Sequence, residues 1–340
     1  MKVYKFVIHE IGKEKNINEA RPTYSDSLNR INQNIEDLVE KLNKGFKRDE
    51  RVVRTEFDDS FTYIFQNEFG NYVCSKTDGQ FFRFSMETIK EMVKIIQGVP
   101  FATGGYFVYT EYSLNDSNTY VGIFLVRDTE GVIFNKREDG KFTVNKTMVI
   151  NTEKLAMAAK ISLQDFEKKN DRYLNLAQPN TGTVSNYFGE NWIGAKLVEK
   201  NNIYTESFLK LIKIVELPIN NETSQKYEID SFREEVFKFI EGNGKVVRLN
   251  EIGDRFWGNP EYLVDIVEEN NLDISNEFKA TSKINYLKKY EIKSGKLKVG
   301  FSLGDVNSGR VRIEEDDKII IEYKPLRNKL DKLNLISKDN

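Results

Sequence analysis

The fold of this chain is decided by two neighbouring stretches, Gly104-Gly-Tyr-Phe-Val-Tyr-Thr-Glu-Tyr112 and Thr119-Tyr-Val-Gly-Ile-Phe-Leu-Val126. Both are rich in aromatic and β-branched residues, which suit the pleated surface of a sheet. The sequence Leu-Asn-Asp-Ser-Asn at 114–118 supplies a turn between them. We therefore predict an antiparallel β-hairpin, because two strand-like runs flank a short turn.

The rest of the first half predicts further strands and two amphipathic helices around this hairpin. Apolar residues spaced three and four apart indicate one helix face over 28–46 and another over 85–97. Ser25 and Asp26 precede the first helix as expected N-caps. We expect one antiparallel sheet packed on these helices, with further strands at 3–8, 132–134, 142–144 and 157–163.

The second half has a polar junction followed by a mainly helical pattern. A helix is expected at 206–216, and the turn-rich residues 218–228 are the expected linker and the expected site of first protease cleavage. Three helices are then expected, one opening with the capping-box pattern Ser231-Phe-Arg-Glu234, one over 249–257 and one opening at Asn259-Pro260. Strands follow near 297–303, 309–314 and 318–323.

The expected fold class is therefore α+β, with two modules. Residues 1–217 form a mixed module whose antiparallel sheet carries packed helices. Residues 225–340 form a helical module that ends in a β-hairpin, an order of elements also found in winged helices.

Composition excludes several classes of protein. The chain has 340 residues, of which 39% are apolar and 12% aromatic, enough to form a buried core. Its formal net charge of −2 excludes a globally basic coat protein, although a locally basic face is compatible with it. No apolar run approaches the roughly 20 residues that span a bilayer.

One cysteine and one histidine restrict the chemistry further. Cys74 alone cannot form an intrachain disulfide or a cysteine-based zinc site, and it lies in a run, 72–75, that predicts a buried strand. His9 is the only imidazole available to a nucleophilic triad, and a packed strand residue explains it better. Gly104-Gly105 and 188–196 lack the spacing of a phosphate-binding loop. We expect no enzyme activity, no cofactor and no bound metal.

Charge changes abruptly along the second module. Residues 216–277 hold 15 acidic and six basic residues, a net charge of −9. Residues 279–300 hold seven lysines and one glutamate, a net charge of +6, with Tyr286 and Tyr290 interleaved. Lysines neutralise phosphates without reading sequence, and aromatic rings stack on bases, so this segment predicts a nucleic-acid surface. An ordinary solvated face is the alternative explanation.

The residues expected to contact phosphate are Lys288, Lys289, Lys293, Lys296 and Lys298, with weaker support from Arg310, Arg312 and Arg327. A competing reading is a Mg²⁺-dependent nuclease, in which Asp305 and the strand residues Glu322 and Lys324 hold a metal and orient water. The pattern is short, and a polar strand edge explains it better.

The whole chain resembles the bacterial nucleoid-associated protein family that includes NdpA and YejK. The resemblance rests on six stretches in the same order: Val99-Pro-Phe-Ala-Thr-Gly-Gly-Tyr-Phe-Val-Tyr109, Tyr120-Val-Gly-Ile-Phe-Leu-Val126, Ile150 to Phe166, Arg172-Tyr-Leu-Asn-Leu176, Val184-Ser-Asn-Tyr-Phe188 and Tyr323-Lys-Pro-Leu-Arg-Asn-Lys-Leu330. It implies a cytoplasmic, nucleoid-located DNA-binding protein without catalysis, and a type II topoisomerase partner. The family's basic residues before the middle helix are replaced here by the uncharged Ala177-Gln-Pro-Asn-Thr-Gly-Thr183.

We therefore expect a DNA-binding protein with little sequence preference, located in the nucleoid, with a homodimer as an open possibility. A rival reading is a protein-interaction adaptor, as a topoisomerase partner or a phage-defence component. The acidic helices would serve such an adaptor by mimicking or repelling DNA.

Overall fold

The predicted hairpin forms the centre of the computed structural model, as strands β4 (Gly105–Ser113) and β5 (Thr119–Val126). The structure describes residues 1–332 except 115–117, 137–141, 153–154, 171, 179–186, 197–199, 221–223, 303–304, 307 and 315–317. The side chains of 131–136, 142–145, 148, 291–294 and 332 also lie outside the description. The predicted turn at 114–118 and the uncharged segment 177–183 fall largely on residues that are not described.

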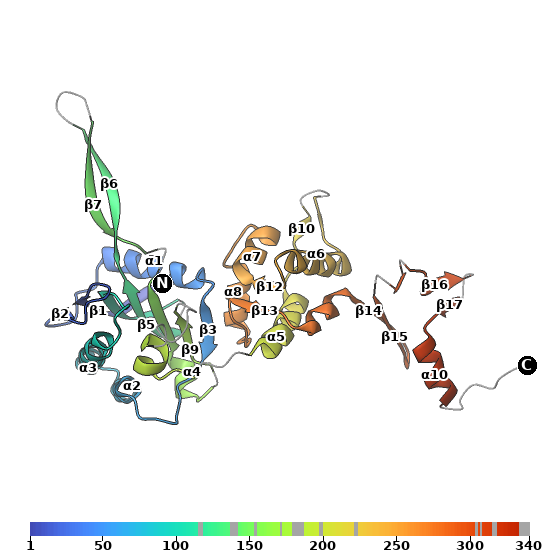
Figure 1. Ribbon diagram of the computed structural model, residues 1–340, viewed down its shortest axis with the longest axis horizontal. Coiled ribbons are helices and arrows are strands. Elements are labelled where there is room, and N and C mark those ends of the chain that lie inside the picture. Colours follow the sequence, from blue (N-terminus) through green and yellow to red (C-terminus); the bar gives the residue numbers. More distant parts are fainter. Residues whose placement is uncertain are drawn as a thin grey trace, which may run out of the picture.

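An antiparallel sheet of seven strands surrounds this hairpin, which confirms the α+β class. Its spatial order is β2 (Arg21–Thr23), β1 (Lys2–Gly12), β4, β5, β8 (Met157–Ser162), β9 (Leu174–Ala177) and β3 (Val52–Thr55). The predicted strands at 132–134 and 142–144 do not join it. They lie in a separate ribbon, β6 (Asp128–Lys136) with β7 (Phe142–Ile150), which projects from the sheet in Figure 1. Both edges of β5 are already paired, with β4 and β8, so the sheet has no place for β6 beside β5.

Helices bury both faces of the sheet, as the continuous apolar character of β4 and β5 requires. Phe107 and Tyr109 face a core that includes α2 (Ile64–Ser75), α3 (Asp78–Gln97) and the π-helix η2 (Tyr187–Ile193). Val108 and Tyr112 face a second core, which includes α1 (Gln33–Lys47). The short helix α4 (Leu163–Glu167) follows β8. The sheet therefore forms the middle of three layers.

Three local predictions were wrong, two at helix starts where another residue is the cap and one at Cys74. Helix α1 begins after Asn32, whose side-chain Oδ1 accepts from the backbone N–H of Ile35 at 3.1 Å. Ser25 is not a cap, since it bonds to β1 instead. Helix α3 begins at Asp78 rather than near 85, with Thr77 as its cap. Cys74 lies exposed on helix α2 and not in a buried strand, because Phe65, Phe69 and Tyr72 are buried at helical spacing.

A separate apolar core organises the second half of the chain. It is built by α5 (Asn201–Ile214), α6 (Ile229–Gly242), α7 (Leu249–Trp257), α8 (Tyr262–Glu269), the paired strands β12 (Val246–Arg248) and β13 (Glu277–Lys279), and the 3₁₀ helix η3 (Ser282–Lys288). The two-residue strands β10 (Ile219–Asn220) and β11 (Gln225–Lys226) pair with each other. Helix α6 begins before Ser231, without a side-chain cap, and α8 begins after Asn259-Pro260, whose asparagine instead accepts from the N–H of Glu261.

The three helices do not form the winged-helix arrangement. A wing would extend the sheet of β12 and β13, but the next hairpin, β14 (Lys289–Ser294) with β15 (Leu297–Ser302), forms a sheet of its own. Within the described part of the chain, no helix is long and apolar enough to cross a membrane.

The linker expected at 218–228 stays a prediction, and the packing favours another position for it. The buried side chains Phe208 and Leu211 of α5 belong to the second core, although α5 precedes this segment. The Oγ1 of Thr205 also accepts from the backbone N–H of Thr281 at 3.1 Å. We therefore propose that the modules divide between Lys196 and Asn201.

A fragment starting at residue 201 should fold with the helical core intact, whereas a fragment starting at 225 should not. The shorter fragment lacks the buried side chains of α5, and each such loss typically costs about 2–5 kcal/mol, against about 5–15 kcal/mol for a whole domain. Thermal unfolding followed by circular dichroism measures this. Cooperative unfolding of the shorter fragment would place the boundary at 218–228 after all.

His9 in β1 is a buried structural residue. Its Nδ1 accepts from the backbone N–H of Ser25 at 3.3 Å, so Nε2 carries the proton toward the Oγ of Ser85, 3.1 Å away. The ring also packs edge-on against Tyr24 and Tyr109. Burial lowers the pKa of His9 from its ordinary 6.5 to about 4.

The folded protein should therefore lose stability as pH falls from 6.5 toward 4. In that range His9 binds a proton in the unfolded chain but not in the folded protein. The free energy of unfolding should therefore fall by about 2–3 kcal/mol. Urea unfolding at pH 7.5, 5.5 and 4.5 measures the loss. His9→Asn is the matched control for the carboxylates that titrate in the same range. Identical pH dependence in both proteins would show that His9 is not the source.

Candidate nucleic-acid interface

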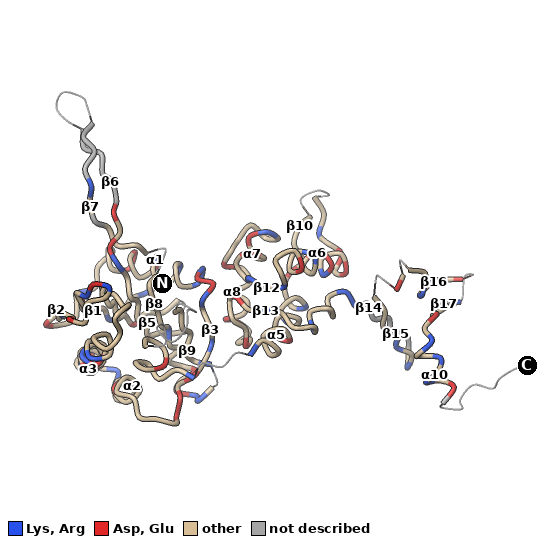
Figure 2. The backbone as a smooth tube through the Cα atoms, viewed as in Figure 1, with Lys and Arg blue, Asp and Glu red and all other residues tan. Residues whose placement is uncertain are grey.

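The lysine-rich segment begins where the second core ends. Leu287 is the last residue of that core, and the chain continues through β14–β15 into a second ribbon, β16 (Val311–Glu314) with β17 (Lys318–Ile321), and helix α10 (Lys324–Lys332). We call 288–332 the C-terminal arm. In Figure 2 both basic and acidic residues are spread along the arm and along the preceding helices.

Strand register separates two faces of the ribbon β14–β15. Lys289 lies opposite Ser302, and Tyr290 lies opposite Phe301 with the two rings stacked at 5.9 Å between centroids. Because side chains alternate along a strand, Lys298 shares the face of Lys289 and Ser302. Position 293 pairs with Lys298, but the side chain of Lys293 lies outside the described residues. The ribbon therefore has one face with lysines and one with stacked aromatic rings.

Two predicted lysines rest on aromatic rings rather than on carboxylates. The Nζ of Lys288 lies 3.9 Å from the ring centroid of Phe237, and that of Lys289 lies 4.0 Å from Tyr286. A ring holds an ammonium group in place without neutralising its charge. Lys296 is exposed in the turn of the hairpin, beside Gly295 with φ of +57°. These three positions present positive charge at the start of the arm.

The three predicted arginines are less available. Arg310 lies 3.1 Å from Asp305, and Arg312 lies 2.6 Å from Glu322. Arg327 is 4.0 Å from Asp331 on the same helix. Each pair has little net charge, so the arginines contribute less to the potential of the arm than the lysines do.

The two carboxylates of the nuclease hypothesis are each paired with an arginine. The Oδ2 of Asp305 accepts from the N–H and Oγ of Ser302 at 2.9 and 2.7 Å, and hydrogen bonds from Ser302, with the charge of Arg310, lower the pKa of Asp305. Arg312 likewise lowers the pKa of Glu322. Among the described residues no group of three His, Cys, Asp or Glu side chains is placed to hold a metal ion. The structure thus gives Asp305 and Glu322 separate arginine partners rather than a shared site with Lys324.

A groove runs along the arm between its two ribbons and α10. It has a volume of about 1060 Å³, and its basic side chains are Lys289, Lys298, Arg310 and Lys329, with Asp305 as the acidic one. Apolar side chains, including Leu297, Phe301 and Leu326, line the rest. Such a mixed lining suits a ligand that carries both phosphates and flat apolar rings.

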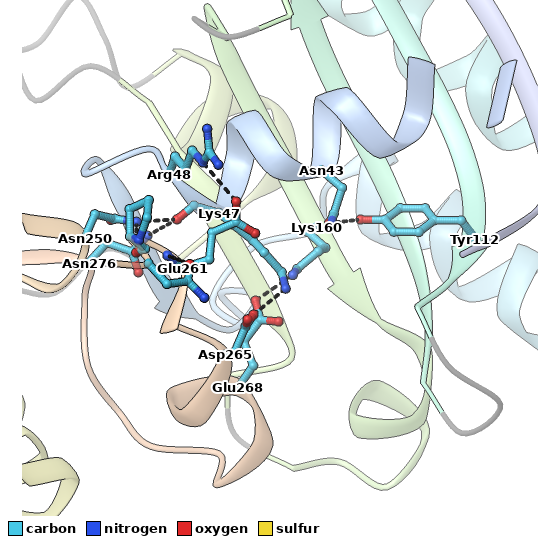
Figure 3. Close-up of polar contacts among 12 residues, drawn as sticks. Asn43, Lys47, Arg48, Tyr112, Lys160, Asn250, Glu261, Asp265, Glu268 and Asn276 are labelled. Atoms are coloured by element: carbon cyan, nitrogen blue, oxygen red, sulfur yellow. Dashed lines mark hydrogen bonds and ion pairs between the residues drawn. The ribbon is translucent and has the colours of Figure 1, made fainter. Parts of the chain in front are cut away.

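Sequence reasoning missed a second charged region, where α8 meets the N-terminal module. Glu261, the N-cap residue of α8, and Asp265 and Glu268 within the helix pair with Arg48, Lys47 and Lys160 at 2.9, 2.5 and 2.6 Å, respectively (Figure 3). The carboxylates recur at spacings of four and three, which places them on one helix face and was readable in the sequence. Their cationic partners come from two distant segments, the end of α1 and β8, so only the fold brings them together.

Backbone contacts support these ion pairs. The side-chain amides of Asn250 and Asn276 donate to the carbonyl oxygen of Lys47 at 3.3 and 3.2 Å (Figure 3). Ser275 and the N–H of Asn276 donate to the carbonyl oxygen of Val52. Burial raises the pKa of Glu268, but the charges of Lys160, Arg54 and Lys47 outweigh it and lower that pKa to about 2. Glu268 is therefore ionised at neutral pH.

The stretch at 99–109 consists of a loop, 99–104, that leads into strand β4. The Nζ of Lys13 donates to the carbonyl oxygens of Pro100 and Ala102 at 3.3 and 2.7 Å. Arg127 donates to the carbonyl oxygens of Thr103 and Gly104 from the other side. A Cβ at Gly104 would lie 1.7 Å from the carbonyl oxygen of Ile11, so only glycine fits there. Requirements of packing explain this stretch without a ligand.

Comparison with known proteins gives one consistent result. The family described as "Nucleoid-associated protein YejK" matches residues 7–325. A nucleoid-associated protein of Pseudomonas paraeruginosa is 24% identical over 207 residues, 60% of this chain and 58% of that protein. Another, of Vibrio vulnificus, is 24% identical over 229 residues, 65% of this chain and 66% of that protein. The chain thus spans less than two thirds of these relatives, while the family match covers both modules, and it belongs to the YejK family of nucleoid-associated proteins.

Proposed function

We propose that the chain binds DNA with little sequence preference, through phosphates contacted by the C-terminal arm. The observation that carries the proposal is the pair Lys288 and Lys289, each held on an aromatic ring. Lys289 also lines the groove that contains further basic side chains. Because the rings already hold these ammonium groups in place, the two lysine side chains lose little conformational entropy when they bind a phosphate backbone. Lysines position a protein on DNA and read no bases, so the binding is expected to be general.

The acidic helical module adds orientation to this binding. Residues 216–277 carry a net charge of −9 and precede the basic arm directly. A polyanion is repelled by the first and attracted by the second, so the arm is favoured as the contact surface. The same acidic helices favour the rival role as an adaptor. Association with a type II topoisomerase, a phage-defence role and a homodimer all stay predictions.

Replacing Lys288, Lys289, Lys293, Lys296 and Lys298 with Gln should weaken binding to all DNA sequences alike. If about four of the five contact duplex phosphates, the slope of log affinity against log salt should flatten by roughly 3.6, at about 0.9 per contact. The measurement is a titration of labelled duplex DNA at several salt concentrations, with circular dichroism to confirm folding.

A matched control removes the same charge elsewhere. It replaces with Gln five exposed lysines that pair with carboxylates on other surfaces, namely Lys44, Lys90, Lys94, Lys226 and Lys238. An equal loss of slope in both variants would mean that net charge, and not the arm, governs binding. Absence of binding by the unchanged protein at low salt would put the adaptor role first.

We further propose that the chain has no nuclease activity, since Asp305 and Glu322 are each neutralised by an arginine. Supercoiled plasmid should stay intact with Mg²⁺ or Mn²⁺. Should cleavage occur, Glu322→Gln identifies its source. Activity lost in that variant, with the fold retained, would support the nuclease instead.

A further inference from the structure

The contact between α8 and the N-terminal module is held by polar interactions. The apolar clusters of the N-terminal module end at Ala195, and the cluster of the helical module begins at Tyr204. Among the described residues no hydrophobic cluster includes side chains from both modules. Ion pairs and hydrogen bonds therefore hold the two together, and such interfaces open more readily than apolar ones.

The cations at this contact outnumber the carboxylates that face them. Lys47, Arg48, Arg54 and Lys160 come from the end of α1, from β3 and from β8, whereas α8 supplies Glu261, Asp265 and Glu268. Arg54 is 5% exposed and reaches Glu268 only at 3.9 Å. Its Nε is buried and has no hydrogen-bond partner among the described residues. The N-terminal module thus has a buried cationic surface that α8 satisfies incompletely.

The surface has the chemistry of a phosphate site. Two of its members, Lys47 and Arg48, lie at the last turn and C-cap of α1, and Lys160 lies over the ring of Tyr120 at 4.8 Å. Helix α8 presents its three carboxylates in a row along one face, an array of negative charge like that of a nucleic-acid backbone.

We propose that Lys47, Arg48, Arg54 and Lys160 form a second site for the DNA phosphate backbone, and that acidic helix α8 occupies this site until DNA displaces it. The proposal rests on the proposed DNA binding. The helical module then acts as an internal competitor. DNA held by the C-terminal arm raises the local phosphate concentration and favours release of α8. Release of α8 separates the two modules, and the N-terminal module then also contacts the DNA.

The test neutralises α8 with Glu261→Gln, Asp265→Asn and Glu268→Gln in the full chain. Neutral side chains compete poorly for the four cations, so affinity for a labelled duplex should rise about tenfold at low salt. The salt slope should steepen by up to about 3.6, for as many as four new contacts. The matched control, Glu234→Gln, Glu235→Gln and Glu241→Gln on α6, changes the net charge equally while leaving α8 intact.

A second readout follows the modules themselves. Small-angle scattering should show a larger radius of gyration for the α8 variant than for the α6 control, and for the unchanged protein when duplex DNA is added. If the α8 variant fails to fold, Glu261→Gln with Asp265→Asn keeps Glu268 on buried Lys160 and should give an intermediate gain in affinity.

Different results would overturn the proposed role of the arm and the proposed second site. Affinity and radius equal in the α8 variant and the α6 control would overturn the second site, while the arm variant still loses its salt slope. An unchanged salt slope in the arm variant would instead overturn the role of the arm, while the gain on neutralising α8 persists.

Discussion

Among the polar contacts that join the two modules, the most deeply buried ion pair is the one between Lys160 and Glu268. Lys160 is wholly buried on β8, where burial lowers its pKa, and a buried cation without a counter-charge is destabilising by several kcal/mol. Glu268 supplies that charge at 2.6 Å from the other module. The requirement to satisfy Lys160 therefore sets α8 against the sheet, and the pairs of Lys47 and Arg48 follow from that placement. Everything beyond α8, including the arm, is positioned through this contact.

Opposite charges on neighbouring parts of one chain give the protein its polarity. The acidic helices face the cations of the N-terminal module, and the basic arm continues beyond them (Figure 2). A uniform surface with the same net charge of −2 would neither attract nor orient a polyanion. The separation of acidic and basic residues along the chain therefore matters more for function than the net charge. The net charge alone would argue against binding to DNA.

The sequence correctly predicted those strands and helices that are determined by the apolar periodicity within a single segment. The hairpin of β4 and β5, the helix at 249–257 and the boundaries of β15–β17 follow from strand and helix periodicity within each segment. The errors arose where distant residues compete. Cys74 was misplaced because three apolar letters resemble a strand, whereas Phe65 and Phe69 impose a helix. The α8 contact was missed because Lys47 of α1, Arg54 of β3 and Lys160 of β8 become neighbours only in the folded chain. The sequence predicted the lysines of the arm, but it did not predict the aromatic rings that hold Lys288 and Lys289.

The most direct test of the central claim is chemical modification of lysines with and without a duplex, read residue by residue by mass spectrometry. The account predicts that DNA protects Lys288, Lys289, Lys296 and Lys298. Lys90 and Lys94 on α3, which pair with Glu87 and Glu91, should react equally in both conditions. Equal reactivity of the arm lysines with and without DNA, together with protection elsewhere, would contradict the account.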